Sequence, residues 1–390
     1  VSSMLDTLCR GMAPYAVPIT GAIAVGLYVL RRAFPSERAR ATVTLAACAV
    51  PMASLSGLPC LTPSTMMTTA LVDMMCIHLV STAADPLLQS TSARDYACHL
   101  LWYLLPIIRT EDDSAHLPPG HDEGHAPDPG SEGRPMGWAH LLQRSAISLG
   151  HALAKLFGGV WLHAVVLTFL APGHHSDAVT SSRTLTQLGC FLFFSMVLGS
   201  DPSNDLLRAA VPLLSRGRYT VLAFNDWALA SRSLAEFWGR RYNRLVSALL
   251  RDRVYTQLRR KRQWNAQEAS MTAFAVSALL HCHVAHTVFR HGIASAGAFF
   301  IIQGLAVAME RHVRIRQSFG DTACRVWALS ILLATAPLYM GLMVHSGAAL
   351  LTASPLTGVA AAVQPMVLRV APVPQAAISG VIRHFGPTKS

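Results

Sequence analysis

Charge is scarce in this 390-residue chain: Asp, Glu, Lys and Arg make up 14% of it, whereas hydrophobic residues make up 52%. A soluble domain of average composition carries about 25% charged residues, because its surface has to be hydrated. The shortage excludes an ordinary water-soluble domain for most of the chain. A bilayer is the solvent that accepts so much apolar surface. The composition therefore predicts an integral, multi-pass membrane protein.

Other features that mark common protein classes are also missing. The eight cysteines include no CxxC pair and lie mostly within apolar runs, which favours free thiols that pack as small hydrophobic groups over a disulfide framework. The net charge of +11 comes from short basic clusters, with no zinc-finger spacing or RNP-like run. These absences argue against a nucleic-acid partner. The basic pair Arg31–Arg32 after the first apolar run also differs from a signal-peptide cleavage site.

Apolar runs of the length that crosses a bilayer, about 20 residues, recur along the chain. They predict an all-α, polytopic fold with about eight or nine transmembrane helices. A shorter apolar run, 96–108, is interpreted as interfacial or re-entrant. The predicted spans are 12–30, 41–60, 63–83, 151–171, 184–200, 268–289, 292–309, 322–344 and 346–367.

A polar segment divides the chain. Residues 110–136 are acidic, rich in Pro, Gly and His, and without apolar periodicity, so a flexible loop is predicted there. Its histidines fit a solvated linker better than a metal-binding tract. The division gives N-terminal transmembrane helices over 1–109, the loop, and a C-terminal core over 137–390.

The basic residues predict the orientation. If the first span runs into the cytosol, strict alternation leaves only Arg183 and Arg290 in the outer loops. Cytosolic loops normally carry the excess of Lys and Arg. The same alternation makes every basic cluster cytosolic, namely those within 31–40, 84–150, 201–267 and 311–316.

The densest basic stretch lies at 233–262. Residues 240–262 contain nine Arg or Lys and one Asp, interleaved with aromatic and leucine side chains. Treated as one helix, the stretch places its apolar residues on one side and its arginines on the other, which suits a helix at the membrane surface. It could attach to anionic lipid, or its arginines could grip the phosphates of a ligand arriving from the cytosol. The charge pattern alone fits both.

Three histidines, His281, His283 and His286, lie in the otherwise apolar span 268–289. An imidazole in hydrocarbon normally faces a cavity, a partner or a reaction. His281 and His283 point about 200° apart on a helix, and Ser277 lies one turn before His281. Histidines at this spacing do not converge on one metal ion, so no metal site is predicted. A purely structural role is expected for His283 or His286.

Two ordered motifs in this region resemble those of plant-type wax synthases, members of the membrane-bound O-acyltransferase superfamily. The first is EFWGRRYN at 236–243, followed by matches at 250–255, and the second is FAVSALLH at 274–281. A weaker match runs from Phe299 to Glu310. The chain departs from the family pattern at Tyr242 (commonly Trp), Ala278 (Gly), Cys282 (acidic) and Gln257 (Pro).

The resemblance implies an acyltransferase with an intramembrane reaction chamber, placed in the endoplasmic reticulum. It would transfer a fatty acyl group from acyl-CoA to a long-chain fatty alcohol and form a wax ester. Acyl-CoA would be the co-substrate, with no cofactor. The implied site has His281 as general base and Asn243 as oxyanion donor or orienting partner, Arg240 and Arg241 at the coenzyme A phosphates, Trp238 at the entrance, and Ser277 holding the histidine ring.

Two other readings stay open. Related enzymes use the same catalytic residues to acylate the hydroxyl groups of other lipids, so the acceptor could be a diacylglycerol or a sterol. A transporter with a histidine proton relay is the alternative from another class, although no inverted repeat is visible. The partners expected from the resemblance are acyl-CoA, a lipid alcohol and membrane lipids. A homo-oligomer is compatible with the sequence.

Overall fold

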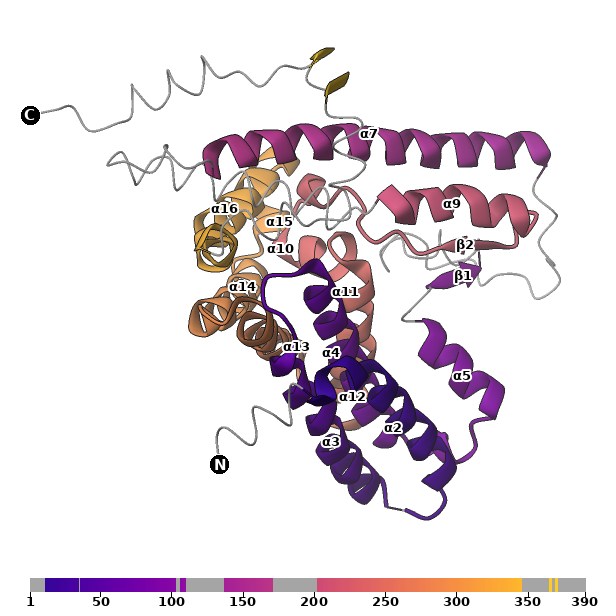
Figure 1. The fold of residues 1–390 in the computed structure, drawn as a ribbon. Coiled ribbons are helices and arrows are strands. Elements are labelled where there is room, and N and C mark those ends of the chain that lie inside the picture. Colours follow the sequence, from indigo (N-terminus) through magenta and orange to yellow (C-terminus); the bar gives the residue numbers. More distant parts are fainter. Residues whose placement is uncertain are drawn as a thin grey trace, which may run out of the picture.

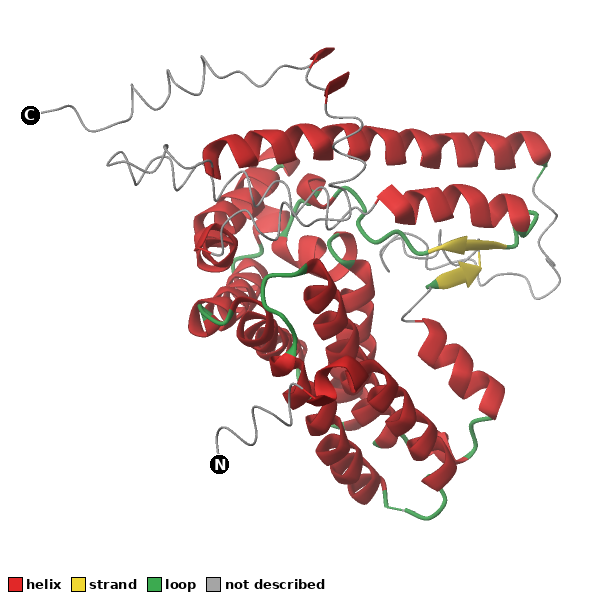
Figure 2. Cartoon of the chain, viewed as in Figure 1, coloured by secondary structure: helices red, strands yellow, loops and turns green. Residues whose placement is uncertain are grey.

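The structure is a computed structural model that describes residues 11–34, 36–102, 106–109, 137–170 and 202–345, with two short stretches at 365–366 and 369–370. Within these ranges helices make up nearly all regular structure, apart from one pair of short strands (Figure 2). Six helices are long and apolar enough to cross a bilayer. The predicted all-α, polytopic membrane class is confirmed.

An N-terminal unit consists of helices α2 (Ala16–Leu30), α3 (Glu37–Ser54) and α4 (Pro63–Ala83) (Figure 1). Polar caps begin two of them, because the first backbone N–H groups of a helix lack partners within it. The Ser36 hydroxyl accepts from Ala39 N at 3.4 Å, and the Thr62 hydroxyl accepts from Thr65 N at 3.1 Å. The buried residues that these helices share include Ala24, Cys48, Leu55, Val72, Cys76 and Leu79.

A C-terminal unit consists of helices α13 (Ala266–Val284), α14 (Ile293–His312) and α16 (Asp321–His345). Asn265 begins α13 with a complete capping box to Glu268. Two glycines of α14 let α13 approach closely: a Cβ atom at Gly297 would lie 2.8 Å from Cys282 Sγ, and one at Gly304 would lie 2.9 Å from Phe274 Cβ. Small residues at such contacts are how membrane helices pack tightly.

A further layer, formed by the middle of the sequence, runs across one end of the helices (Figure 1). Helix α7 (Trp138–Leu170) packs along α9 (Pro202–Leu214), and Lys155 forms an ion pair with Asp205. Strand β1 (Ile107–Arg109) pairs antiparallel with β2 (Tyr219–Val221).

The remaining helices are α5 (Ala93–Trp102), α10 (Leu234–Glu236), α11 (Arg244–Leu250), α12 (Thr256–Lys261) and α15 (Ile315–Ser318). Single helical turns lie at Ala13–Tyr15, Leu55–Gly57, Pro86–Gln89 and Ala228–Ala230 (3₁₀) and at Phe237–Arg241, Arg251–Tyr255 and Ala285–Phe289 (π).

Most predicted spans correspond to these helices. The six apolar helices are Ala13–Leu30, Glu37–Gly57, Ser64–Ala83, Ala266–Phe289, Ile293–His312 and Asp321–Leu342. The predicted span 151–171 falls within the longer helix α7, whereas 184–200, 346–367 and the loop 110–136 lie outside the described residues. The count of eight or nine spans therefore stays a prediction.

The run 96–108 contains the end of α5, at Trp102, and residues of β1, and its interfacial or re-entrant position stays a prediction. One prediction about a shorter segment was wrong. The basic stretch 233–262 is not one helix. Its helical path breaks at Tyr242, which has an extended backbone (φ −96°, ψ 132°), and at Asn243, which has φ 42°. Asn is one of the few non-glycine residues that adopt this left-handed conformation readily.

Candidate active site

The FWGRR motif begins on a short helix, α10, that is fixed by side chains at its start. Ser233 Oγ accepts from Glu236 N at 2.9 Å. The buried Glu310 carboxylate, on α14, accepts from Leu234 N at 3.2 Å and from Ala235 N at 3.3 Å. A carboxylate at a helix N-terminus satisfies unpaired donors and faces the positive end of the helix dipole. Glu310 therefore ties the motif to a transmembrane helix.

Trp238 is the centre of an aromatic cluster. Its Nε1 donates to Gln303 Oε1 at 3.1 Å, and Gln303 Nε2 donates to Thr335 Oγ1 at 2.7 Å. Gln303 is fully buried, so this relay supplies the partners that a buried amide requires. It links the motif to both α14 and α16. The rings within 4.9–6.4 Å of the Trp238 ring are Phe237, Tyr242, Phe274, Phe299 and Phe300.

His281 lies at the edge of the same aromatic cluster. Its imidazole stacks on Phe300 with the ring centroids 3.7 Å apart, and the edge of Tyr339 meets it at 5.4 Å. Nδ1 is 2.7 Å from the backbone oxygen of Ser277. A carbonyl only accepts, so Nδ1 carries the hydrogen and Nε2 keeps its lone pair. No hydrogen bond to Nε2 occurs within the described part of the chain. This tautomer is the one that a general base needs.

The surroundings of His281 are mostly aromatic. His281, Tyr242 and Tyr339 lie deep among protein atoms, yet each side chain keeps some accessible surface. Burial raises the pKa of Tyr242 to about 12, so this phenol stays protonated and neutral. The surrounding residues come from α13, α14, α16 and the FWGRR segment. Apolar surroundings of this kind suit a reaction between lipids.

Comparison with known proteins finds a family that is similar to this region. Residues 221–302 match the Membrane bound O-acyl transferase family, and the matched range contains Trp238, Asn243 and His281. This part of the chain is similar to the membrane-bound O-acyltransferase family. The resemblance drawn from its two motifs is thereby confirmed.

Named relatives agree with the family match. A probable long-chain-alcohol O-fatty-acyltransferase 8 of Arabidopsis thaliana is 33% identical over 121 residues, which cover 29% of this chain and 36% of the relative. A putative long-chain-alcohol O-fatty-acyltransferase 10 from the same plant is 34% identical, over 25% of this chain and 31% of the relative. The long-chain-alcohol O-fatty-acyltransferase of Simmondsia chinensis is 31% identical, over 33% and 38%. The chain thus spans only about a third of the length of these relatives.

Asn243 already has a structural role. Its Oδ1 accepts from Val246 N at 3.3 Å and caps α11, and its backbone N donates to Asn225 Oδ1 at 2.6 Å. The amide Nδ2 makes no hydrogen bond to any described residue and is the donor left for chemistry. No hydrogen bond joins Asn243 to His281. A series of ring contacts, from Tyr242 to Trp238 to Phe300, separates Asn243 from His281.

The two arginines of the motif differ. Arg240 is exposed, with no ion pair to a described residue. Arg241 Nε pairs with Glu236 Oε1 at 2.6 Å, and its NH1 donates to Asp226 O at 3.1 Å. Arg241 therefore joins the motif to the preceding loop, and Arg240 is the better placed of the two to meet a phosphate. Downstream exposed cations that extend this positive surface are Arg251, Arg259, Arg260, Lys261 and Arg262.

His283 occupies the opposite face of α13. Its Nδ1 is 2.8 Å from Asp73 Oδ1 on α4, and its Nε2 is 3.2 Å from the backbone oxygen of Met52 on α3. Asp73 is only 2% exposed. His283 thus has the structural role that was expected for it or for His286, and the exposed His286 has no such partner among the described residues.

Three residues around the site were not identified from the sequence. Tyr339 carries no motif, and only the packing of α16 brings it to His281. Glu310 was noted as a family match without its role at α10. Asp73 could have been identified, because a carboxylate within an apolar span normally has a partner inside the protein.

Proposed function

We propose that this chain transfers a fatty acyl group from acyl-CoA to a long-chain fatty alcohol, forming a wax ester and free coenzyme A. The observation that carries the proposal is the state of His281. Its ring is held by the Ser277 carbonyl and by Phe300, with Nε2 left as a lone-pair acceptor among aromatic rings.

The chemistry requires few groups. The alcohol is a weak nucleophile, so Nε2 of His281 takes its proton as the alcohol oxygen attacks the thioester carbonyl carbon. The carbon–sulfur bond then breaks, and the thiolate leaves with the proton that the imidazolium returns. The negative oxygen of the tetrahedral intermediate needs a hydrogen-bond donor. Asn243 Nδ2 is the side-chain donor we assign to it, which requires substrate binding to bring Asn243 and His281 into contact with the same carbonyl group.

The same proposal assigns the binding groups. Arg240 and the exposed cations from Arg251 to Arg262 would meet the phosphates and diphosphate of coenzyme A at the cytosolic mouth. The acyl chain would then pass along the Trp238 cluster toward His281. A multi-pass enzyme that draws acyl-CoA from the cytosol and releases a neutral lipid into the bilayer fits the endoplasmic reticulum membrane.

The direct test is ester synthesis by His281→Ala in microsomes supplied with labelled acyl-CoA and a fatty alcohol. General-base catalysis contributes about 10²–10⁴-fold, so we expect a loss of that size at unchanged protein level. His286→Ala is the matched control, because His286 is an exposed histidine one turn further along, and it should keep its activity within about threefold. Full activity of His281→Ala would sink the base assignment.

The acceptor is tested by letting alcohols compete. Long-chain alcohol, diacylglycerol and sterol are supplied together to a cell that makes no neutral lipid of its own and expresses this chain. We expect wax ester as the main product. Mostly triacylglycerol or steryl ester would keep the acyltransferase and replace the acceptor. Absence of any acyl-CoA-dependent thiol release by the purified protein would instead favour the transporter reading.

A further inference from the structure

Tyr339, on α16, places a phenol beside the imidazole of His281. The two ring centroids are 5.4 Å apart, and the rings lie at 78° to each other. Both side chains are partly buried. Phe300 and Tyr339 are the aromatic neighbours of His281 among the described residues, and Tyr339 is the polar one of the two.

The Tyr339 hydroxyl makes no hydrogen bond to any described residue. A buried phenol normally finds a partner, because an unpaired hydroxyl in apolar surroundings loses the hydrogen bonds that water gave it. Unlike Trp161 Nε1 and Trp327 Nε1, which are buried without a partner, the hydroxyl is not sealed inside the protein. A phenylalanine would fill the same place among the rings without an unpaired group, so the hydroxyl points to a partner in a bound molecule.

The Tyr339 ring is held in a fixed orientation. It stacks on Phe299 with the ring centroids 5.7 Å apart, and Phe300 meets it at 5.8 Å. One turn earlier on α16, Thr335 Oγ1 accepts from Gln303 Nε2 at 2.7 Å, which fixes the rotation of α16 against α14. A donor that is held in place before the reaction needs no rearrangement when charge develops.

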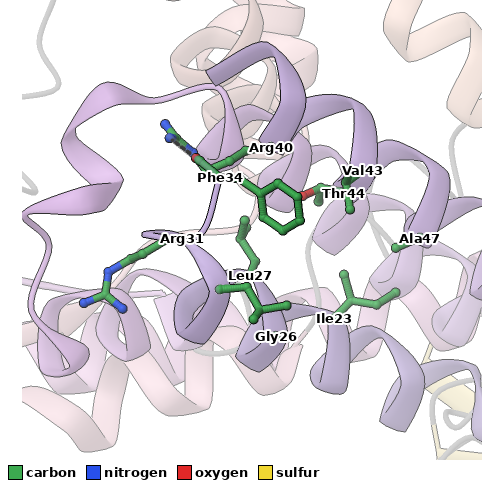
Figure 3. A pocket seen from close by; sticks show the side chains of 10 residues that line it. Ile23, Gly26, Leu27, Arg31, Phe34, Arg40, Val43, Thr44 and Ala47 are labelled. Atoms are coloured by element: carbon green, nitrogen blue, oxygen red, sulfur yellow. Dashed lines mark hydrogen bonds between the residues drawn. The ribbon is translucent and has the colours of Figure 1, made fainter. Parts of the chain in front are cut away.

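The apolar groove between α2 and α3 offers no comparable pair of groups. Figure 3 shows Leu27 and Gly26 on one side of this groove, with Val43 and Ala47 on the other. No histidine or tyrosine of the described chain lines it. A base and a phenol that can meet one carbonyl group therefore come together at His281 and not in this groove.

The thioester oxygen becomes negative when the alcohol attacks, and a positioned donor to such an oxygen contributes about 10²–10³-fold to kcat. Asn243, the donor already assigned, is separated from His281 by a series of ring contacts. On the basis of the proposed acyl transfer, we infer that Tyr339 is a catalytic residue, whose hydroxyl donates a second hydrogen bond to the thioester carbonyl oxygen.

The phenol proton stays on Tyr339 throughout this step. The alcohol oxygen bonds to the thioester carbon, its proton passes to Nε2 of His281, and the carbonyl electron pair moves onto the oxygen that Tyr339 contacts. When the carbonyl bond re-forms, the carbon–sulfur bond breaks, and the thiolate takes the proton from the imidazolium. The hydrogen bond is stronger in the intermediate than in the bound substrate, so it raises kcat more than it lowers KM.

The test measures ester synthesis from acyl-CoA and a fatty alcohol by Tyr339→Phe, with the full chain in phosphatidylcholine nanodiscs. We expect kcat to fall about 10²-fold or more, while the KM for acyl-CoA changes less than about threefold. Tyr96→Phe is the matched control, because the Tyr96 hydroxyl donates to the backbone oxygen of Ala24 at 2.8 Å, outside the site. This variant also removes one phenol oxygen, and it should keep kcat within about threefold.

A second measurement reads the hydrogen bond itself. Infrared difference spectroscopy records the carbonyl stretch of bound acyl-CoA with an isotope-labelled thioester carbonyl, in the absence of alcohol. We expect this band at lower wavenumber in the unchanged chain than in Tyr339→Phe, because a hydrogen bond weakens the carbonyl bond. His281→Ala should lose turnover and yet keep the band of the unchanged chain, since it removes the base and leaves the donor.

Three results would overturn the inference. They are full kcat in Tyr339→Phe, an equal fall of kcat in Tyr96→Phe, or a carbonyl band that Tyr339→Phe does not move. An unchanged chain that makes no ester at all would contradict the proposed function as well, so the two failures can be told apart.

Discussion

The two sides of α13 hold the same residue in opposite states. On one side, His281 stacks on Phe300 and uses only Nδ1 in a hydrogen bond, to a carbonyl of its own helix. Its Nε2 makes no hydrogen bond to a described residue. On the other side His283 uses both ring nitrogens, one on Asp73 and one on the Met52 carbonyl. A histidine with both nitrogens occupied cannot take a proton from a substrate. The partners, not the residue type, decide which of the two can act as a base.

The two sides of α13 also differ in their contacts with neighbouring helices. The His283 side joins α13 to the N-terminal unit through further contacts, since Thr287 Oγ1 donates to Thr69 Oγ1 at 3.3 Å and Leu61 N donates to Val288 O at 2.9 Å. Among the described residues, His281 makes no hydrogen bond to a neighbouring helix and is instead surrounded by aromatic rings. We therefore expect changes on one side to affect stability and changes on the other to affect turnover.

The largest expected effect comes from His281→Gln compared with His283→Gln in the same preparation. His281→Gln should lose about 10²–10⁴-fold in kcat with little change in thermal stability, because only the base is removed. His283→Gln should lower the melting temperature and reduce kcat much less in the protein that stays folded. Thermal unfolding and steady-state kinetics on both variants check this. Equal kinetic losses with equal stability would erase the distinction between the two sides.

The next effect concerns the pair formed by Asp73 and His283. Asp73→Asn alone should cost about 3 kcal/mol, because it removes the carboxylate partner of a buried hydrogen-bonded pair. Replacing both members, as in Asp73→Leu with His283→Leu, should recover most of that loss, since paired apolar replacements are often close to neutral. Reversible unfolding in detergent or bicelles measures the cycle. An additive double variant would mean that the two residues do not act as a pair.

Much of this arrangement follows from the sequence, and the missing part has a physical reason. The apolar spans could be predicted because a helix in lipid must satisfy its own backbone and present apolar side chains. His281 and Trp238 could be singled out because their motifs are local. The Asp73–His283 pair could not, because the two residues are 210 positions apart and only tertiary packing joins them. Tyr339 was missed for the same reason.

The break at Tyr242 and Asn243 illustrates a subtler limit. The periodicity of 233–262 favours a helix on both sides of the break, so no pattern of apolar residues marks it. The one local signal is Asn243 itself, which tolerates positive φ and caps the following helix. The roles proposed for Asn243, Arg240, Arg241, Trp238 and Ser277 remain predictions.

The close contact of α13 with the glycines of α14 gives a smaller effect. Gly304→Ala should destabilise by about 1–3 kcal/mol, because its Cβ would press on Phe274 Cβ at 2.9 Å and on Met271 Sδ at 3.2 Å. It should also lower kcat, since it shifts α13 relative to Phe300. Gly297→Ala meets only Cys282 Sγ, so adding Cys282→Ala should restore stability. Failure of that rescue would show that α14 does not pack on α13 as described.

The smallest expected effect concerns the two arginines of the motif. Arg241 is held by partners within the protein, as His283 is, whereas Arg240 is exposed. Arg240→Gln removes an exposed cation and should raise the KM for acyl-CoA by no more than about fivefold, because an exposed ion pair contributes at most about 1 kcal/mol. The rise should shrink as salt is added, since salt screens exposed charges. Arg241→Gln should leave the salt dependence unchanged and instead lower stability, because its guanidinium holds Glu236 and the Asp226 carbonyl. Initial rates over a range of acyl-CoA and salt concentrations, beside melting curves, separate the two. If Arg241→Gln gave the salt-dependent KM and Arg240→Gln did not, the phosphate contact would belong to the arginine that now pairs with Glu236, and substrate binding would have to open that ion pair.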